Sequence, residues 1–491
     1  MSFLQSLQSS SVFSHGDVSV LPVWQYFSEI CQIPRPSKHE EKIRQYLLAF
    51  ANQRGLDAKT DEAGNVLISK PAMPGCEHLP VVVLQSHMDM VCEKNSSSPH
   101  RFEHDAITPI IDGEWVKASG TTLGADDGIG MAAQLALLAS NNITHAPLQC
   151  LFTVDEETGL TGAAALQTGF FSGSSLINLD SEDEGEIFIG CAGGMDTVAV
   201  FPLELEPMPQ GYFPFEVRIS GLKGGHSGDD IHRGLANANK LMARFLFHIQ
   251  QELGMRLVAL EGGNLRNAIP REAYALAVVP MKQKEPVRVA FNLFIHEMEQ
   301  EFSDVEPGMR FHLESTDLPS QLWPIDMQHR LLRALMAVPH GVIEMSKSME
   351  GLVETSTNLA SVKMTEQQVV VTTSQRSSVE SAKHYVGAMV ESVFVLAGAQ
   401  VAHSDGYPGW TPNLDSPLLK MARERYQQCF GVQPRVRAIH AGLECGLFLE
   451  KFPALDMISF GPTLRGVHSP DERLHIPSVL KFWQFLVNMV H

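Results

Sequence analysis

The stretch Val-Val-Val-Leu-Gln-Ser-His-Met-Asp-Met, residues 81–90, predicts a buried β-strand that ends in polar side chains. Three valines and a leucine form a short apolar run of the kind found in parallel strands that are covered on both faces. Ligands of open α/β sheets bind beyond the carboxyl ends of the strands, which is where His87 and Asp89 lie. Because they are two residues apart on an extended chain, Asp89 could orient the His87 ring if that ring binds a metal. Alone, the pattern more often marks an ordinary polar strand end.

Helical and strand patterns alternate on both sides of this stretch and predict an α/β fold. We expect helices at 20–33, 38–53, 128–140, 417–430 and 479–490, and strands at 65–69, 81–87, 148–154, 175–179, 435–439 and 456–460. Ser37 and Glu40 have the spacing of a capping box at the start of the second helix. This order predicts a mainly parallel sheet covered by helices.

The pattern changes in the middle of the chain. Apolar and polar residues alternate there as in half-exposed strands, and these strands are accompanied by helices. We expect strands at 215–220, 273–279, 311–314 and 368–374, and helices at 235–253, 287–302, 328–337 and 379–398. This composition predicts an α+β insert rather than a continuation of the sheet. The expected domains are therefore 1–193 with 407–491, interrupted by 194–406. The insert has no strict repeat, although two strand–helix halves are compatible with it.

Composition narrows the class of protein. The 491 residues carry 37 lysines and arginines against 56 aspartates and glutamates, a formal charge of −19, which argues against nucleic acid and anionic membranes as partners. Seven scattered cysteines without a Cys-x-x-Cys pair fit reduced thiols better than a disulfide framework. The N-terminus lacks the features of a signal peptide, and no run of 18 apolar residues occurs. We expect a cytoplasmic protein.

Four more polar clusters follow predicted strands or open a predicted helix of the outer domain. They are Asp126 and Asp127 between glycines 124 and 128, the pair Glu156 and Glu157, Asp180, and His468. Each taken singly fits a helix cap, a solvated turn or a loop histidine. These separate explanations are less plausible jointly. They would require the four clusters and the polar end of the strand at 81–87 to reach one edge of the sheet by chance. Glycines around two aspartates do not suit a phosphate site, because the carboxylates would repel phosphate.

Two histidines and three or four carboxylates suit a divalent metal, zinc above all, with manganese or cobalt as substitutes. That number of ligands is high for one catalytic zinc ion and fits two ions that share a bridging carboxylate. Such a pair lowers the pKa of a bound water toward about 7 and polarises a carbonyl group. Glu156 and Glu157 point in different directions, so one could bind metal while the other takes the proton of the water.

These residues, in this order, resemble the motif set of the co-catalytic zinc peptidases, which include carboxypeptidase G-type enzymes, tripeptidases and carnosinases. The stretches that carry the resemblance are Gly-Thr-Thr-Leu-Gly-Ala-Asp (120–126), Gly-Cys-Ala-Gly-Gly (190–194), Lys-Gly-Gly-His-Ser-Gly (223–228), Arg-Asn-Ala-Ile-Pro-Arg-Glu (266–272) and His-Ala-Gly-Leu-Glu-Cys-Gly (440–446). The resemblance covers nearly all of the chain apart from about the first fifteen residues. It implies a di-zinc catalytic domain at 1–193 and 407–491 and a lid and dimerisation domain at 194–406.

The resemblance also implies which side chains bind metal. His87 and Asp180 would hold one zinc ion, and Glu157 and His468 the other. Asp126 would bridge the two ions.

Further roles follow from the same resemblance. Asp89 would orient His87, and Glu156 would be the general base for attack by the metal-bridging water. The bond between Asp126 and Asp127 is cis in relatives. Aspartate rather than glutamate at position 180 implies an amino- or dipeptidase rather than a carboxypeptidase.

Three residues of the insert match positions that bind substrate in the family. Arg376 would pair with the substrate carboxylate, His226 would stabilise the oxyanion, and Asn267 would also contact substrate. From their spacing alone, each could equally be a surface or turn residue. The family often places the histidine in the partner's site through a homodimer joined by the inserts.

The function implied is that of a metallo-dipeptidase cleaving Xaa-His dipeptides, carnosine-like substrates included. The alternatives are a tripeptide aminopeptidase or an N-acyl amino acid deacylase on the same site, or a non-catalytic metal-binding relative. Retention of Glu156 argues against the last of these. A serine hydrolase and a thermolysin-like site are disfavoured, because neither Gly-x-Ser-x-Gly nor His-Glu-x-x-His occurs.

Overall fold

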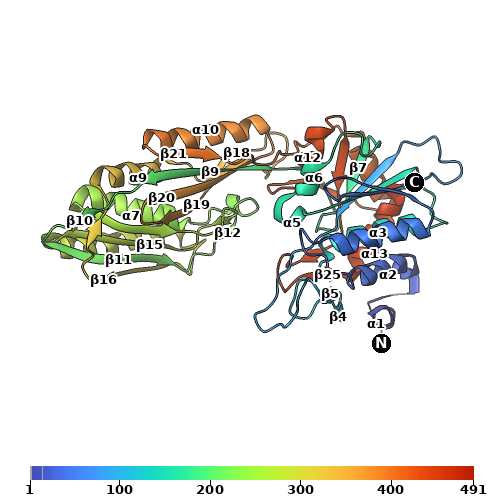
Figure 1. The fold of residues 1–491 in the computed structure, drawn as a ribbon, viewed down its shortest axis with the longest axis horizontal. Helices are drawn as coiled ribbons and strands as arrows, with labels where there is room; N and C mark the ends of the chain where they lie inside the picture. Colours follow the sequence, from blue (N-terminus) through green and yellow to red (C-terminus); the bar gives the residue numbers. More distant parts are fainter. Residues whose placement is uncertain (1–2, 11, 14) are drawn as a thin grey trace. The chain divides into compact units, whose positions relative to one another are not determined.

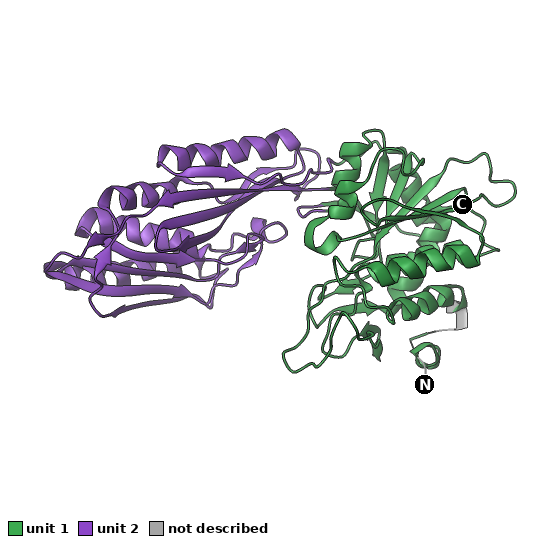
Figure 2. Ribbon diagram, in the orientation of Figure 1, with its two compact units in different colours: residues 1–190, 412–438, 443–491 green, residues 191–411, 439–442 purple. Residues whose placement is uncertain are grey.

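The computed structural model describes residues 3–10, 12–13 and 15–491 and divides into two compact units (Figures 1 and 2). Unit 1 comprises residues 1–190, 412–438 and 443–491, and unit 2 comprises residues 191–411 and 439–442. The divisions lie within five residues of the expected ones. The segment 439–442 belongs with unit 2 because the Ala192 N–H donates to the carbonyl groups of Ile439 and Ala441. Of the expected outer domain, residues 1, 2, 11 and 14 lie outside the described residues.

Unit 1 contains an eight-stranded sheet in the order β1-β2-β6-β3-β7-β23-β8-β22. Its strands are β1 (Asp57–Thr60), β2 (Val66–Lys70), β3 (Val82–His87), β6 (Leu148–Thr153), β7 (Ser175–Asn178), β8 (Glu186–Cys191), β22 (Arg435–Ile439) and β23 (Asp456–Ser459). The central strands β6, β3, β7 and β23 pair in parallel, whereas β1 pairs with β2, β2 with β6, and β8 with β23 in antiparallel fashion. The expected α/β fold class, with helices over the sheet, is confirmed.

The helices of unit 1 pack on this sheet or on one another (Figure 1). They are α1 (Phe3–Ser9), η1 (His15–Val20), α2 (Leu21–Ile30), α3 (Glu41–Gln53), α4 (Ala125–Ala139), α5 (Glu156–Gly159), α6 (Thr161–Ala165), α11 (Pro417–Phe430), α12 (Glu444–Lys451) and α13 (Ile476–Met489). Helix α4 is apolar on all sides because it packs against both β3 and α2. A small sheet in the order β24-β25-β5-β4 completes the unit, with β4 (Ile110–Asp112), β5 (Trp115–Lys117), β24 (Leu464–Arg465) and β25 (Arg473–His475).

The predicted capping box at the start of α3 is wrong. Glu40 is the N-cap residue and its side chain does not cap the helix. Ser37 Oγ instead donates to Asp89 Oδ2 at 2.7 Å, and Glu40 Oε1 accepts the N–H groups of Lys38 and Asp155. Both side chains therefore serve the end of β3 and the turn after β6, which a local sequence pattern does not reveal.

Unit 2 contains two modules with the same chain topology. The inner module runs β11 (Tyr212–Ser220), α7 (Ala238–Leu253), β13 (Arg256–Gly262), β15 (Ala273–Pro280), α8 (Lys284–Phe302) and β16 (Arg310–Ser315). The outer module runs β9 (Gly193–Pro202), α9 (Ile325–Ala337), β19 (Val353–Met364), β20 (Gln368–Ser377), α10 (Glu380–Leu396) and β21 (Gln400–His403). Each is a β-α-β-β-α-β unit of the ferredoxin-like kind, and the inner module is inserted after the first strand of the outer one.

The two modules form one antiparallel sheet in the order β16-β11-β15-β13-β19-β20-β9-β21, with β18 (Gly341–Met345) paired to β19. The second strands of the modules, β13 and β19, pair antiparallel at the junction. A shared hydrophobic core lies between one face of this sheet and the four long helices. The insert thus contains two halves with repeated topology, an arrangement with which the sequence pattern was compatible. Short elements complete the unit: β10 (Glu206–Pro207), β12 (Gly225–His226), η2 (Ile231–Arg233), β14 (Ala268–Ile269), η3 (Met281–Gln283) and β17 (Gln321–Leu322).

None of the seven cysteines, all of which belong to the described part of the chain, forms a disulfide. No described helix combines the length and the apolar character needed to cross a membrane.

Candidate metal centre

The five side chains predicted to bind metal come together in unit 1, at the carboxyl ends of the parallel strands. His87 is the last residue of β3, Asp180 lies two residues after β7, and Glu157 follows β6 on the short helix α5. Asp126 lies in the first turn of α4, and His468 lies in the loop between β24 and β25. The crossover connections of a parallel sheet bring these separate segments to one edge.

Asp126 lies at the centre of the cluster. Its Oδ1 is 3.0 Å from His87 Nε2, and its Oδ2 is 3.2 Å from His468 Nε2. The two oxygen atoms of one carboxylate thus face two different histidines. Asp180 Oδ1 lies 3.6 Å from the same His87 nitrogen, and Glu157 Oε2 lies 3.0 Å from the same His468 nitrogen.

Two groups of possible metal ligands result, and they share one member. One contains His87, Asp126 and Asp180, and the other Asp126, Glu157 and His468; the ligand atoms of each lie within 4.8 Å of one another. Glu157 Oε1 is buried and has no hydrogen-bond partner in the described structure. The residues therefore fit a pair of divalent ions in ligand type, number and sharing.

The electrostatics of the cluster also favour bound cations. Among the described residues, only histidines form ion pairs with Asp126, Glu157 and Asp180. Burial and the nearby Asp126 carboxylate raise the pKa of Asp180, whereas hydrogen bonds that the His468 ring donates to Asp126 and Glu157 raise the pKa of His468 to about 11. Both shifts favour the protonated forms, and metal ions would compete with protons for these groups.

Asp89 is fully buried and holds the parts of the site in place. Its Oδ1 lies 3.4 Å from His87 Nδ1, an ion-pair distance, and accepts the backbone N–H of Glu156 at 3.0 Å. Its Oδ2 accepts the N–H of Glu157 at 3.2 Å as well as the Ser37 hydroxyl. Burial opposes the charged form, but His87 and these hydrogen bonds lower the Asp89 pKa to about 2. One carboxylate therefore links β3 to the turn that carries both glutamates.

Glu156 and Glu157 differ in their surroundings. Glu157 faces His468, whereas Glu156 belongs to a different group of close ligand atoms, with His87 and Glu157. Burial raises the pKa of Glu156; His87 opposes the shift, and the charges of Glu157 and Glu444 add to it. A carboxylate with a raised pKa beside the cluster is suited to accept a proton and pass it on.

Asp127 forms no ion pair with a described histidine, and its side chain caps the regular part of α4. Its Oδ1 accepts the Gly130 N–H at 3.0 Å, and the side chain is buried. The peptide bond between Asp126 and Asp127 is cis, as the family resemblance implied. Of the two aspartates, one therefore has the helix-capping role that either could have had from the sequence alone.

Two buried charged residues near the site were not predicted. The Glu472 carboxylate accepts four backbone N–H groups of residues 123–126, and the Arg35 guanidinium donates to the carbonyl groups of Met88, Asp89 and Gly124. The sequence offers little signal for either, because each looks like a charged residue in a proline-containing loop. For Glu472, its place four residues after His468 is the one available hint.

The three predicted substrate-binding residues belong to unit 2, where both modules contribute. His226 on β12 pairs with Ala268 on β14, and the Ser227 N–H donates to the Asn267 carbonyl at 2.8 Å. Arg376 lies near the end of β20 in the other module, and its Nε donates to Ser227 Oγ at 3.3 Å. The structure therefore brings the segments of His226, Asn267 and Arg376 together within this unit.

The surroundings of His226 and Arg376 suit the predicted roles. The N–H groups of Gly228 and Asp229 donate to His226 Nδ1, so the neutral ring carries its proton on Nε2. Arg376 is 7% exposed and Nη1 donates to the Tyr407 hydroxyl at 3.0 Å. Within the described structure, Nη2 donates no hydrogen bond, so one edge of the guanidinium remains available for a carboxylate.

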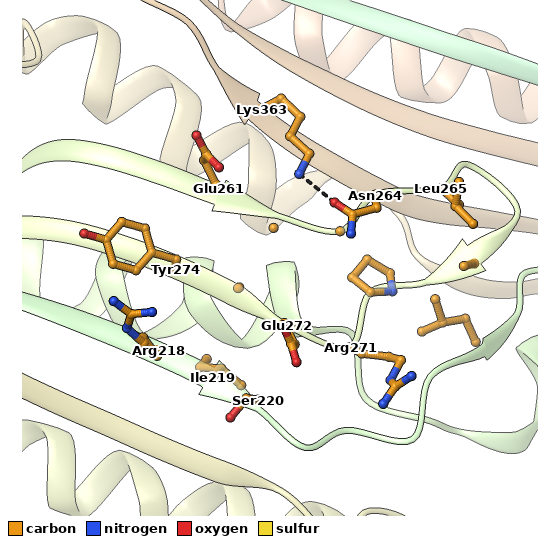
Figure 3. Close-up of a pocket in the computed structure, with 16 residues that line it drawn as sticks. Arg218, Ile219, Ser220, Glu261, Asn264, Leu265, Arg271, Glu272, Tyr274 and Lys363 are labelled. Carbon is orange, nitrogen blue, oxygen red and sulfur yellow. Dashed lines mark hydrogen bonds between the residues drawn. The ribbon is translucent and has the colours of Figure 1, made fainter. Parts of the chain in front are cut away.

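A pocket of about 810 Å³ also lies in unit 2, on the sheet face opposite the hydrophobic core (Figure 3). It is lined by charged side chains such as Arg218, Glu261 and Lys363 and by residues 262–265 and 268–274. Lys363 Nζ donates a hydrogen bond to Asn264 Oδ1 in this pocket. None of the predicted site residues lines this pocket.

Comparison with known proteins places this chain in a family. Residues 83–491 match the model of peptidase family M20/M25/M40. The chain is 45% identical over 475 residues to the cytosol non-specific dipeptidase of Escherichia coli K12, covering 97% of this chain and 98% of that protein. The crystal structure of aminoacylhistidine dipeptidase from Vibrio alginolyticus matches with a TM-score of 0.88 at 46% identity, covering 99% and 98% of the two chains. A tripeptidase structure from Staphylococcus aureus has the same fold, with a TM-score of 0.56 at 17% identity, covering 96% and 97%.

The chain belongs to peptidase family M20/M25/M40. It is a peptide-bond hydrolase, and its close homologues are dipeptidases.

Proposed function

We propose that this protein is a di-zinc dipeptidase that cleaves Xaa-His dipeptides, carnosine-like substrates included. The observation that carries the metal assignment is the position of Asp126, whose two carboxylate oxygens face His87 and His468 separately. His87 and Asp180 would hold one ion, Glu157 and His468 the other, and Asp126 both. Two histidines with three carboxylates favour zinc, with manganese or cobalt as substitutes.

When bound, such a pair of ions makes a water molecule a stronger acid and polarises the peptide carbonyl. The chain itself supplies the remaining groups. Glu156 would take the proton of the attacking water and return it to the leaving amine. Asp89 would hold both the His87 ring and the backbone of Glu156 during this transfer.

The residues of unit 2 would select the substrate. The Arg376 guanidinium, held by Ser227 and Tyr407, would pair with the C-terminal carboxylate of a short peptide. His226 would donate from Nε2 to the oxyanion, and Asn267 would contact the substrate beside it. A requirement for the free carboxylate would restrict the enzyme to short peptides that end at this point.

The names of the relatives leave two versions of the specificity. The Vibrio protein is an aminoacylhistidine dipeptidase, which supports the Xaa-His preference, whereas the E. coli protein is a non-specific dipeptidase, which supports a broader range. A tripeptide aminopeptidase or an N-acyl amino acid deacylase would use the same metal residues. We propose the Xaa-His preference as the first to test.

Location and assembly are part of the proposal. The E. coli relative is named for the cytosol, and a chain whose seven cysteines form no disulfide in the described structure suits a reducing cytoplasm. A homodimer through unit 2 would cover exposed apolar side chains on α8 and α10, among them Val289, Leu293 and Leu396. Sedimentation velocity would give the oligomeric state directly.

Metal analysis combined with a substrate panel tests the function. Purified protein is expected to contain two zinc ions per chain and to lose activity on chelation and regain it with Zn²⁺. It should hydrolyse Xaa-His dipeptides faster than tripeptides or N-acyl amino acids. Full activity in metal-free protein would refute the mechanism, and a preference for tripeptides or acylated amino acids would shift the assignment to one of the alternatives.

A further inference from the structure

Glu472 is a buried glutamate in the same loop as His468. Its side chain is 2% exposed, and it lies four residues after the histidine, just before β25. A buried carboxylate is costly unless hydrogen bonds or charges compensate it, so its partners indicate what it does.

Those partners are four consecutive backbone N–H groups. Oε2 accepts from Leu123 at 2.6 Å and from Gly124 at 2.9 Å. Oε1 accepts from Ala125 at 2.8 Å and from Asp126 at 3.3 Å. These amides form the turn into α4, where a helix leaves donors without partners and where negative charge is favoured. The carboxylate fills that position from within the protein.

The other side of the turn is held by Arg35. Its guanidinium donates to the Gly124 carbonyl and to the carbonyl groups of Met88 and Asp89, which flank the end of β3. Gly124 has a φ of +69°, and a Cβ atom there would lie 2.7 Å from Arg35 Nη2. The backbone before Asp126 is therefore fixed from both sides, with no space for a side chain between.

We infer that Glu472 is a positioning residue that sets the backbone of Asp126 relative to His468. The inference rests on the proposed function, in which Asp126 holds both metal ions. In that function, His468 at one end of the loop would bind one ion. Glu472 at the other end accepts hydrogen bonds from the turn that carries Asp126, the shared ligand. Loss of this grip should therefore weaken both metal positions together, unlike loss of Glu157 or Asp180, each of which serves one.

Metal titration of Glu472→Gln tests this inference. The substitution keeps the volume of the side chain but turns an amide NH2 toward two backbone donors. Binding of Zn²⁺ and, separately, Mn²⁺ to metal-free protein would be measured by competition with a chromophoric chelator. We expect both sites to bind 10- to 100-fold more weakly, as for other groups that orient metal ligands.

Glu306→Gln is the matched control. Glu306 is also a buried glutamate, 1% exposed, whose carboxylate accepts backbone N–H groups, those of Lys223 and Ala236 in unit 2. The Glu306→Gln substitution should lower the unfolding temperature of metal-free protein without changing its metal affinity. If Glu472→Gln does the same, Glu472 has only a structural role and the inference is overturned.

Two further measurements keep the result interpretable. Glu472→Asp retains the charge but shortens the side chain by one carbon–carbon bond, so it should also weaken both sites. It serves as the test if the Gln variant fails to fold. Unchanged metal affinity in Glu472→Asp would also overturn the inference. Wild-type protein and Asp126→Asn report on the proposed function separately. If wild type binds no metal, or Asp126→Asn binds it as tightly as wild type, the metal assignment fails rather than the role of Glu472.

Discussion

At the residue scale, the neighbouring residues Glu156 and Glu157 have different surroundings, so their substitution should have different effects. Glu157 faces His468, and Glu156 lies beside the cluster with a pKa raised by burial. Glu157→Gln is expected to lower metal content, because it removes a ligand. Glu156→Gln is expected to keep both ions but lower kcat by about 10²- to 10⁴-fold, because it removes proton transfer.

Metal content and kcat, measured on the same preparations, check this prediction. Asp127→Asn is a useful control, because Asp127 caps α4 and forms no ion pair with a described histidine. Reversed phenotypes for the two glutamates would exchange the assignments of base and ligand.

Arg376 allows a second prediction for a single residue. A dipeptide amidated at its C-terminus lacks the charge that the guanidinium would pair with. Its kcat/KM should fall by a factor that corresponds to about 1.5–3 kcal/mol. The same modification should have little further effect in Arg376→Met. Equal rates for free and amidated peptides in wild type would remove Arg376 from the substrate site.

The structure brings together the five residues that the sequence predicted as metal ligands, whereas the residues that support them, apart from Asp89, were not predicted. The five candidates could be chosen because metal ligands are of few residue types and often follow strand ends; they are His87, Asp126, Glu157, Asp180 and His468. Their supporting residues carry no such signal, because a backbone amide accepts any correctly placed carboxylate. Ser37 and Glu40 were assigned to a local helix cap and instead bond groups 52 and 115 residues away.

At the scale of elements, the strands and helices with clear periodicity were predicted within a few residues. Helix α11 and strand β22 have the expected bounds, Pro417–Phe430 and Arg435–Ile439. Strands β9, β13 and β19 were missed, although they lie in the interior of the unit 2 sheet. The pairing of β13 with β19 joins residues about a hundred positions apart, such as Gly262 and Val362, which no local pattern encodes.

His340, just before β18, predicts a pH dependence of the stability of unit 2. Burial, with a smaller effect of Lys240, lowers its pKa from 6.5 to about 4. Its Nδ1 accepts the Leu359 N–H at 3.3 Å, so the folded protein holds the ring neutral. The unfolded chain binds a proton at higher pH than the folded chain, so stability should decrease as pH falls from 6.5 toward 4.

The loss attributable to His340 over this range is about 3 kcal/mol, from roughly 2.5 pKa units. Urea unfolding of metal-free wild type and His340→Asn between pH 4 and 7 measures it, since asparagine retains an acceptor but does not titrate. The variant should lose less stability than wild type as pH falls. Parallel curves for the two proteins would show that His340 does not titrate in this way.

At the scale of the whole molecule, the duplicated module in unit 2 bears on how a dimer would use His226. The family resemblance implied that this histidine reaches the site of the partner subunit. A second copy could extend the unit 2 sheet only at its edges, and β13, which leads into the Asn267 segment, is covered by β19 of the same chain. Residues from both modules already meet in one chain, as the bond from Arg376 to Ser227 shows.

We therefore predict that His226 serves its own chain, even in a homodimer joined through the helices. His226→Ala should lower kcat by about 10²- to 10³-fold, as loss of one oxyanion donor does elsewhere, with metal content unchanged. The decisive measurement mixes His226→Ala with Glu156→Gln protein under conditions that exchange subunits. If each histidine serves its own chain, every site in a mixed dimer keeps one lesion and mixing restores no activity. If the histidine serves the partner, one site carries both lesions and the other carries none. In a random mixture half of the dimers are mixed, so about a quarter of wild-type activity would return.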